Sequence, residues 1–285
     1  MRDKRKTTVE LTVVGGDRKG VVAAFTNFIF KNGGNIEATN QSVNGGLFGM
    51  HLEASFNARP EKSNLERQLS SLAKDLGMEV RVHYHEPDRE PRVAILVTRE
   101  PHCLRGVLEA VEKGDLRVKV AVIVGSEATL APLARSWGIP FYVANQKDRG
   151  KRERRTIQIM ERRDVDMVVL ARYMWVLSAN LVWRYPNKII NIHPSLLPAF
   201  PGAMPYQQAY DNGARIVGCT AHFVTVNLDQ GPIIWQETIK VRPNEGVQSI
   251  RRRGQQLEAK TLVKALQLCT QGKVEVRWGR THFTK

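Results

Sequence analysis

The stretch KIINIHPSLLPAFPGAMPY, residues 188–206, decides how the chain folds. Its first part, KIINIH (188–193), is a short and densely apolar run of the kind that forms a strand buried on both faces of a parallel sheet. The rest holds four prolines and a glycine, which exclude regular helix and central strand. We therefore predict a buried strand that ends at His193 and continues into a rigid loop.

Four more short apolar runs precede this strand, and helical patterns separate them. Together they predict α/β architecture with a Rossmann-like, mostly parallel sheet. After the loop, CTAHFVTV and PIIWQETIKV (219–226 and 232–241) indicate a late pair of strands, and residues 246–271 predict a long helix. The four runs are RVAILVT (92–98), KVAVIVG (119–125), PFYVA (140–144) and DMVVLA (166–171).

The N-terminal region follows a different pattern. TTVELTVV (7–14) alternates like a strand, the next helix stops at Gly33–Gly34, and Asn44-Gly45-Gly46 is a strong hairpin signal. The resulting order βαββαβ is that of ferredoxin-like domains. EPDREP (86–91) is charged and bracketed by proline, as linkers often are. We expect two domains, residues 1–86 and 87–285.

The composition is that of a globular protein, with 42% hydrophobic and 25% charged residues in 285. No run of eighteen apolar residues predicts a membrane span, and the basic start lacks the features of a secretory signal. The three cysteines, Cys103, Cys219 and Cys269, lack CxxC spacing, so neither a disulfide framework nor structural zinc is expected. We expect a cytoplasmic protein.

The chain is strongly basic, with 43 Lys and Arg against 28 Asp and Glu, a net charge of +15. The excess concentrates after residue 147, in KDRGKRERR (147–155) and in RRR (251–253). A solvated helix face, attraction of a small anionic substrate and nucleic-acid binding would each explain it. Because Glu153 interrupts the basic residues of the first segment, the solvated face is favoured and no nucleic-acid partner is expected.

Asn191 and His193 stand where ligands bind in an open parallel sheet, at the carboxyl end of a strand. They are two residues apart, so both side chains point to one face. An amide and an imidazole aimed at one point suit a developing oxyanion. Asp229, in the loop VNLDQGP (226–232), could fold back beside His193 and orient or deprotonate a water. Taken singly, such a histidine is more often structural and such an aspartate a turn former.

Other polar residues carry weaker signals. His222 is either a packed core histidine or a support for Asp229, and Thr220 is a second candidate for supporting the site. Cys103 is a conceivable thiol nucleophile beside His102, but no base for it is evident. No histidines or carboxylates stand at a metal-ligand spacing such as HExxH, so no metal is expected.

Two long segments carry a family resemblance. NIHPSLLPAFPG (191–202) and TAHFVTVNLDQGPII (220–234) resemble the signature of the folate-dependent formyltransferase-fold enzymes. The resemblance implies that Asn191, His193 and Asp229 are the catalytic residues. It also implies a pterin pocket formed by ARYMWVL (171–177) and the aspartate loop, where ordinary core packing is the alternative. The folate-binding candidates are Met174, Val176, Leu177, Thr225 and Leu228.

Members of this group differ in their formyl acceptors. Glycinamide ribonucleotide formyltransferases hold a phosphate with a glycine-rich loop after the first strand, and backbone amides at a helix N-terminus make such a loop an anion site. VTREPHCLRGVL (97–108) stands there instead, with Pro101 and His102-Cys103. The methionyl-tRNA enzymes have a C-terminal barrel, for which the residues after Asp229 leave no room.

Formyltetrahydrofolate deformylases, in contrast, are similar over essentially the whole chain. GGDRKGVVAAFTNFI (15–29) resembles the start of their ACT domain, and LVTREPHCL, LARYMWVLS and PNKIINIH resemble further deformylase segments. One position departs from this resemblance. Pro194 stands where these enzymes commonly have a second histidine, so the acceptor is less firmly implied than the formyl chemistry.

The resemblance implies hydrolysis of 10-formyltetrahydrofolate to tetrahydrofolate and formate, which balances one-carbon pools for purine biosynthesis. Folate is then the substrate, and no separate cofactor is expected. The alternative is transfer of the formyl group to an amine. For the ACT-like domain the resemblance implies homo-oligomers and an amino-acid effector at Gly34, Asn35 and Ile36, where a helix stop that uses glycine explains the residues equally well.

Overall fold

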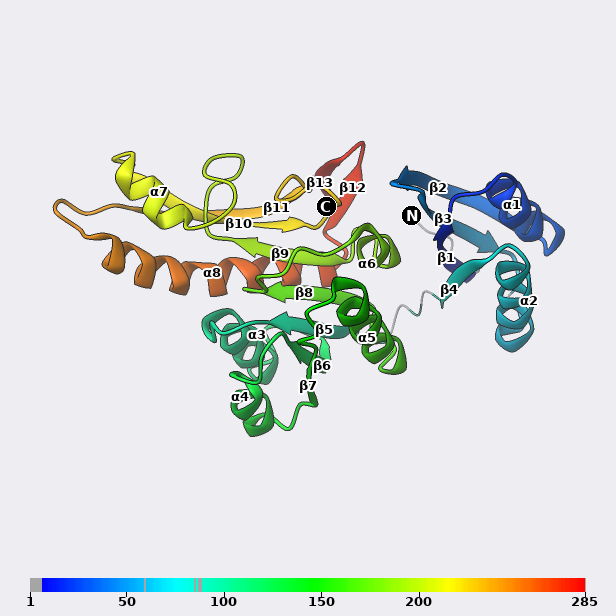
Figure 1. Cartoon of the computed structure of the whole chain (residues 1–285), viewed down its shortest axis with the longest axis horizontal. Helices are drawn as coiled ribbons and strands as arrows, with labels where there is room; N and C mark the ends of the chain where they lie inside the picture. Colours follow the sequence, from blue (N-terminus) through cyan, green and yellow to red (C-terminus); the bar gives the residue numbers. More distant parts are fainter. Residues whose placement is uncertain (1–6, 59, 85, 87–88, 285) are drawn as a thin grey trace. The chain divides into compact units, whose positions relative to one another are not determined.

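The computed structural model describes residues 7–58, 60–84, 86 and 89–284 (Figure 1). The chain divides into two compact units. The first runs to Arg89 and includes Ser178–Pro186, and the second comprises Glu90–Leu177 and the chain from Asn187 onwards. The predicted boundary between residues 86 and 87 adjoins positions 87–88, which lie outside the described residues, as does the basic start of the chain at 1–6. The boundary stays a prediction.

The first unit has the predicted order βαββαβ. Its four strands form one antiparallel sheet in the order β2-β3-β1-β4, and the Asn44–Gly46 hairpin joins β2 to β3 as expected. The elements are β1 (Thr7–Gly16), α1 (Val21–Lys31), β2 (Gly34–Asn44), β3 (Leu47–Phe56), α2 (Lys62–Asp75) and β4 (Met78–Tyr84).

The core of this unit lies between one face of the sheet and the two helices. Alternate strand residues, such as Leu11 and Leu52, pack with Phe25 of α1 and Leu69 of α2, and all four are fully buried. Period-two alternation in the strands places these side chains on one face. The ferredoxin-like arrangement expected from the sequence is confirmed.

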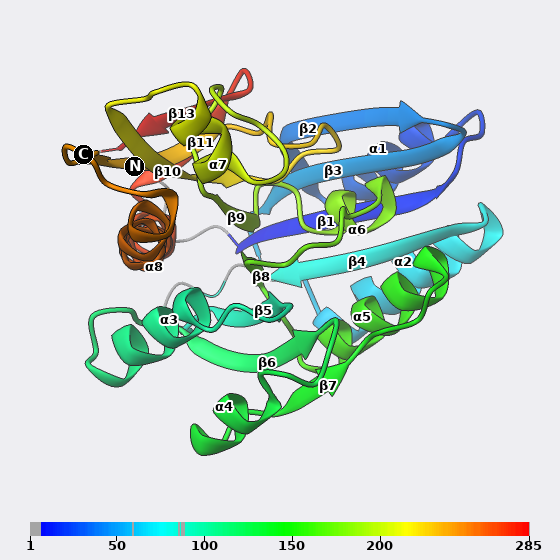
Figure 2. The ribbon, with the colours of Figure 1, turned by 60° about the vertical axis from the view of Figure 1, so that its left-hand side comes forward.

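The second unit is built on a seven-stranded sheet in the order β11-β10-β9-β8-β5-β6-β7. β5 to β9 pair in parallel, whereas β10 and β11 form the late antiparallel pair (Figures 1 and 2). The strands are β5 (Arg92–Val97), β6 (Lys119–Gly125), β7 (Phe141–Val143), β8 (Met167–Ala171), β9 (Ile189–His193), β10 (Ile216–Phe223) and β11 (Ile233–Lys240).

Helices cover this sheet, and the longest of them, α8, contributes to one wall of the site described below. α3 and α8 lie beside each other (Figure 2) and pack with the strands into one apolar core, to which Leu104 and Leu266 contribute. The helices of the second unit are α3 (His102–Glu112), α4 (Ala131–Ser136), α5 (Arg149–Arg162), α7 (Pro205–Asp211) and α8 (Val247–Thr270), whereas α6 (Ala179–Arg184) belongs to the first unit.

Two features differ from the sequence analysis. A last hairpin, β12 (Val274–Arg277) and β13 (Arg280–Phe283), was not predicted. The basic segment 147–155 is also not a purely solvated face. It opens α5 with an Asp148 cap, and although Lys151 is exposed, Arg152 is only 3% exposed. Among the described residues, no helix is both long and apolar enough to traverse a bilayer.

Candidate active site

A cavity of about 520 Å³ opens at the carboxyl ends of β8 and β9. Both strands point toward the side of the unit where α7 and the start of α8 lie (Figure 1). Asn191, His193 and Asp229 all line this same cavity.

Asn191 is oriented by a buried histidine on the neighbouring strand. Its amide Nδ2 lies 3.2 Å from Nε2 of His222, which is 1% exposed. The other ring nitrogen, Nδ1, lies 2.9 Å from the Phe223 carbonyl oxygen. Because a carbonyl can only accept, Nδ1 carries the proton and Nε2 accepts from Asn191. Burial lowers the pKa of His222, while the Phe223 carbonyl and Asp229 oppose this effect.

His193 and Asp229 form the charged part of the site. Asp229 Oδ2 lies 3.3 Å from His193 Nδ1, and both side chains are less than a tenth exposed. On the far side of the ring, Nε2 lies 3.2 Å from the Phe200 carbonyl oxygen. Its two ring nitrogens thus face acceptors on opposite sides, the Asp229 carboxylate and the Phe200 carbonyl.

The loop geometry aims Asp229 at this histidine. Asp229 has a φ of 55°, in the left-handed region, and its Oδ2 accepts from the Gly202 amide at 3.3 Å. Oδ1 lies 3.9 Å from His222 Nε2, beyond hydrogen-bond length, and makes no hydrogen bond within the described part of the chain. Oδ1 is thus the oxygen that can hold a water at the cavity.

Thr220 fastens the proline loop instead of supporting Asp229. Its hydroxyl, fully buried, donates to the Ser195 carbonyl at 2.7 Å and accepts from the Leu197 amide at 3.0 Å. It also accepts from Gln236 Nε2 at 2.9 Å. The loop that follows His193 is therefore held to β10 by one side chain.

The expected folate-binding residues line the same cavity, and most of them are too exposed to be ordinary core. Met174, Val176 and Leu228 are 64%, 52% and 57% exposed, whereas Leu177 is buried. Large exposed apolar side chains around a cavity are typical of a ligand site. Thr225 also lines the cavity and donates to the Asn227 carbonyl.

Arg152 stiffens the segment that bears these residues. Its guanidinium carbon lies 3.6 Å from the centre of the Trp175 ring, and Nη1 donates to the Gln146 carbonyl at 2.9 Å. Burial raises the pKa of the neighbouring Tyr173, with Arg152 acting in the opposite direction. No pattern in the sequence distinguishes Arg152 from the other basic residues of α5.

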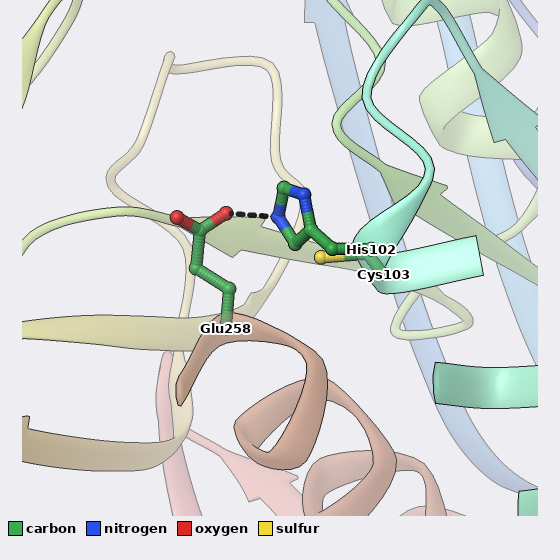
Figure 3. Close-up of side chains that lie close together, drawn as sticks. All are labelled: His102, Cys103 and Glu258. Atoms are coloured by element: carbon green, nitrogen blue, oxygen red, sulfur yellow. Dashed lines mark hydrogen bonds and ion pairs between the residues drawn. The ribbon is translucent and has the colours of Figure 1, made fainter. Parts of the chain in front are cut away.

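His102 and Cys103 do not line the cavity but lie beside Glu258 of α8 (Figure 3). Cys103 is fully buried, and burial followed by the charge of Glu258 raises the pKa of its thiol well above the usual value. A nucleophilic cysteine needs a lowered thiol pKa and access to substrate. Because Cys103 is fully buried and its pKa is raised, it has neither property.

Three cavity residues were not singled out by the sequence analysis: Tyr206, Arg251 and Arg172, the last of which lies in the segment 171–177 that was expected to form the pocket. Arg172 directly follows β8 and has a φ of 59°. Its position at the carboxyl end of a parallel strand is the one signal that could have found it. Tyr206 and Arg251 lie on α7 and α8, whose approach to the site depends on tertiary packing.

The residues proposed for an amino-acid effector begin β2. A Cβ on Gly34 would lie 2.7 Å from Ile29 and 2.8 Å from Phe56, so close packing already explains that glycine. Asn35 donates to Glu37 at 3.0 Å, and Ile36 packs against the core of the unit. The effector site stays a prediction.

Two family models match the chain. Residues 91–266 match the formyl transferase model, and residues 7–83 match the ACT domain model. The two matches fall on the two regions that the sequence analysis separated.

Curated relatives and solved structures extend this similarity to nearly the full length. The formyltetrahydrofolate deformylase of Bacillus subtilis (strain 168) is 34% identical, with 98% of this chain and 95% of the relative covered. That of Escherichia coli (strain K12) is 38% identical, with 95% and 96% covered. The deformylase structure from Burkholderia mallei ATCC 23344 has a TM-score of 0.67 at 30% identity and covers 98% of this chain and 99% of its own.

A transferase structure matches a smaller part. Glycinamide ribonucleotide transformylase 1 from Symbiobacterium toebii also has a TM-score of 0.67 at 30% identity, and 97% of it is covered, but it covers only 71% of this chain. The ACT-like region is therefore part of the similarity to the deformylases, beyond the length that this transferase matches.

Proposed function

The chain belongs to the formyl transferase family, and within it to the formyltetrahydrofolate deformylases, and we propose that it hydrolyses 10-formyltetrahydrofolate to tetrahydrofolate and formate. The observation that carries the proposal is the contact of Asp229 with His193 at 3.3 Å, beside Asn191 in one cavity. Full-length similarity to the deformylases, ACT region included, favours water as the acceptor.

The reaction needs a water to attack the formyl carbon. Asp229 Oδ1 holds that water and takes its proton as the new C–O bond forms. Negative charge then develops on the former formyl oxygen. The second N–H of Asn191, the first being bonded to His222, donates to this oxygen. When the carbon–N10 bond breaks, a proton passes to N10 and formate is released.

His193 completes the site once the loop around Phe200 adjusts. Nε2 now contacts the Phe200 carbonyl at 3.2 Å, and Phe200 has a positive φ of 52°. Displacement of this carbonyl by substrate frees the Nε2 proton for the oxyanion or for N10. The Asp229 contact on Nδ1 keeps the ring oriented during this exchange. 10-Formyltetrahydrofolate is a substrate, so the scheme uses no separate cofactor.

The acceptor is tested by the composition of the assay. The protein is incubated with 10-formyltetrahydrofolate alone and formate is followed, then the assay is repeated with a primary amine present. Release of formate without an amine supports hydrolysis. Formate or formyl-amine that appears only after an amine is added supports the alternative, a transferase. Pro194, the one position that departs from the deformylase resemblance, makes this comparison necessary.

For the ACT-like unit we propose an amino-acid effector and self-association. The match of residues 7–83 to the ACT domain model supports this role. Calorimetry with a panel of amino acids, together with sedimentation of the full chain, tests it. Heat from one amino acid that disappears in Asn35→Ala supports the effector site. The absence of heat with every amino acid rules it out, and a monomer at all concentrations rules out self-association.

A further inference from the structure

A network of polar side chains contacts the residues that line one wall of the active-site cavity. Arg172, Tyr206 and Arg251 line the cavity on this side. Behind them stand two carboxylates, Glu258 and Glu100, and His102 lies between these two. The mechanism above uses none of the three lining residues.

Glu258 is the centre of the network and is 1% exposed. Its Oε1 accepts from the Tyr206 hydroxyl at 2.8 Å. Its Oε2 lies 3.0 Å from His102 Nε2 (Figure 3) and 3.6 Å from Arg172 Nε. Both oxygens are thus committed to groups of the chain itself.

Glu100 holds the other lining arginine. Its Oε1 accepts from Arg251 Nη2 at 2.6 Å, and its Oε2 accepts from Gln255 Nε2 at 3.0 Å. His102 Nδ1 lies 3.8 Å away. The basic side chains that a phosphate-bearing substrate would need here are paired with carboxylates. The carboxylates that an amine substrate would need are paired with these basic side chains.

Backbone conformation restricts Arg172, and close packing restricts Tyr206. Arg172 has the left-handed φ of 59°, which is uncommon outside glycine and asparagine. Its buried Nε lies at ion-pair distance from Glu258, 3.6 Å, and has no hydrogen-bond partner among the described residues. The Tyr206 ring lies so close to Gly254 of α8 that a Cβ there would come within 2.6 Å of it. A bulkier residue at position 254 would push the ring away from Glu258.

A metal ion does not explain the cluster. His102, Cys103 and Glu258 present donor atoms within 4.8 Å of one another. However, Arg172 already places a positive charge beside the same Glu258 oxygen.

Stability alone does not account for the network either. Buried ion pairs are often no more stabilising than apolar residues of similar volume, because both charges lose their water. A cavity of about 520 Å³ suits one ligand of moderate size. An amine acceptor is bulkier than water and would need more of the cavity beside the formyl carbon, and Arg172, Tyr206 and Arg251 occupy part of its lining.

We propose that Arg172, held by Glu258, closes this wall against amine substrates and so makes water the formyl acceptor. The inference rests on the proposed hydrolysis and assigns its specificity to Arg172. With the wall open, an amine nitrogen attacks the formyl carbon in place of water. The new C–N bond forms as the carbon–N10 bond breaks, and the proton lost by the amine passes to N10.

The test measures the partition between two products. 10-Formyltetrahydrofolate is incubated with glycinamide, and N-formylglycinamide and formate are quantified for the wild type, Arg172→Ala and Arg172→Lys. Arg172→Ala should raise the ratio of N-formylglycinamide to formate at least about tenfold, the scale of discrimination by packing alone. Arg172→Lys, which keeps charge and much of the bulk, should stay nearer the wild type. The ratio does not depend on the fraction of folded enzyme.

Two further variants keep the test decisive. Arg172→Ala leaves a buried carboxylate without its cation and is expected to be less stable, so Arg172→Ala/Glu258→Gln removes both charges and should show the same rise. Arg99→Ala, which breaks an exposed pair with Glu127 at 2.7 Å, should keep the wild-type ratio.

The outcomes separate this inference from the proposed function. If the ratio of N-formylglycinamide to formate stays unchanged in Arg172→Ala and in Arg172→Ala/Glu258→Gln while formate is still released, the role of Arg172 is overturned. The proposed hydrolysis then still stands. The same variants are also assayed with hydroxylamine, a much smaller amine. If its ratio of formylated product to formate rises as much as that of glycinamide, the variants are generally more reactive with amines, and the role of Arg172 is again overturned. If the wild type releases no formate without an amine, hydrolysis fails and the inference fails with it.

Discussion

His222 shows how a single buried side chain prepares the site. Its Nδ1 proton is committed to the Phe223 carbonyl at 2.9 Å, so Nε2 is free to accept from Asn191. A protonated His222 would face Asn191 with a donor and turn the amide away. The proposed oxyanion role of Asn191 therefore requires the neutral form of this ring, which burial favours by lowering the pKa of His222.

This burial makes stability dependent on pH. The unfolded chain binds the His222 proton with a pKa near 6.5, higher than in the folded protein. The free energy of unfolding should therefore fall as the pH drops from about 6.5 toward the lowered folded-state pKa. Urea denaturation of the wild type and His222→Gln at about pH 7.5 and about pH 5.5 checks this. The advantage of the wild type over the variant should shrink at the lower pH.

The exposed His282 supplies the control, because His282→Gln should leave the pH dependence of the wild type intact. A wild-type advantage that grows as the pH falls would reverse the sign and refute the neutral assignment.

Strand periodicity was enough to place Asn191 and His193 at one sheet end, and the family signature added the loop residue Asp229 as a candidate. Arg172 and Tyr206 could not be predicted in this way. Their roles depend on Glu258, which is 86 positions after Arg172 along the chain, and only the packing of α8 against the sheet brings it there. The Phe200 carbonyl beside His193 was equally hidden, since a backbone atom leaves no mark in a motif.

At the scale of elements, the proline loop after β9 depends on β10. Thr220 connects the two through the Ser195 carbonyl and the Leu197 amide. Thr220→Val keeps the shape but leaves these buried groups without a partner. We expect a loss of about 1–3 kcal/mol in the free energy of unfolding, measured by chemical denaturation. Formate release should fall as well, because the loop follows His193.

Thr261→Val is the matched control, a buried threonine on α8 whose hydroxyl oxygen is 3.2 Å from the Cys219 sulfur, a weak donor. The expected order is a larger loss for Thr220→Val than for Thr261→Val. Equal losses would show that Thr220 is not a special anchor.

The contact of α7 with α8 is a second element-scale feature, because Gly254 makes room for Tyr206. Alanine favours helix over glycine by about 1 kcal/mol, but the clash with the ring should outweigh this gain. We expect Gly254→Ala to destabilise the protein by about 1–3 kcal/mol. Gly150→Ala in α5, where the nearest atoms are an ordinary 3.4 Å away, should be neutral or stabilising. Thermal unfolding of both variants tests whether the melting temperature falls for Gly254→Ala and stays or rises for Gly150→Ala.

Most elements could be predicted from the sequence because their apolar patterns are strong. The β12–β13 hairpin could not, since its turn is Trp278-Gly279, both with positive φ, and lacks the usual Asn-Gly or Asp-Gly signal. The assignment of Ser178–Pro186 to the first unit was also beyond the sequence, because it reflects contacts between distant parts of the chain.

For the molecule as a whole, the net charge of +15 bears on substrate binding. The glutamate tail of folate is anionic, so a basic surface on the second unit would attract longer tails more strongly. Raising the salt concentration should then weaken binding of a polyglutamylated substrate more than of the monoglutamate, because salt screens exposed charges. Fluorescence titrations at low and high salt measure this. If salt weakens the binding of both substrates equally, the basic surface does not bind the glutamate tail.

The central claim concerns the whole molecule, namely that the chain hydrolyses 10-formyltetrahydrofolate with Asp229 acting on water. The most direct measurement is the rate of formate release from this substrate alone, for the wild type and Asp229→Asn. We predict release by the wild type without any acceptor, and a fall of about 10²–10⁴-fold in the variant, the usual contribution of a general base. Formate release by Asp229→Asn at the wild-type rate, or no release by the wild type until an amine is added, would contradict the account.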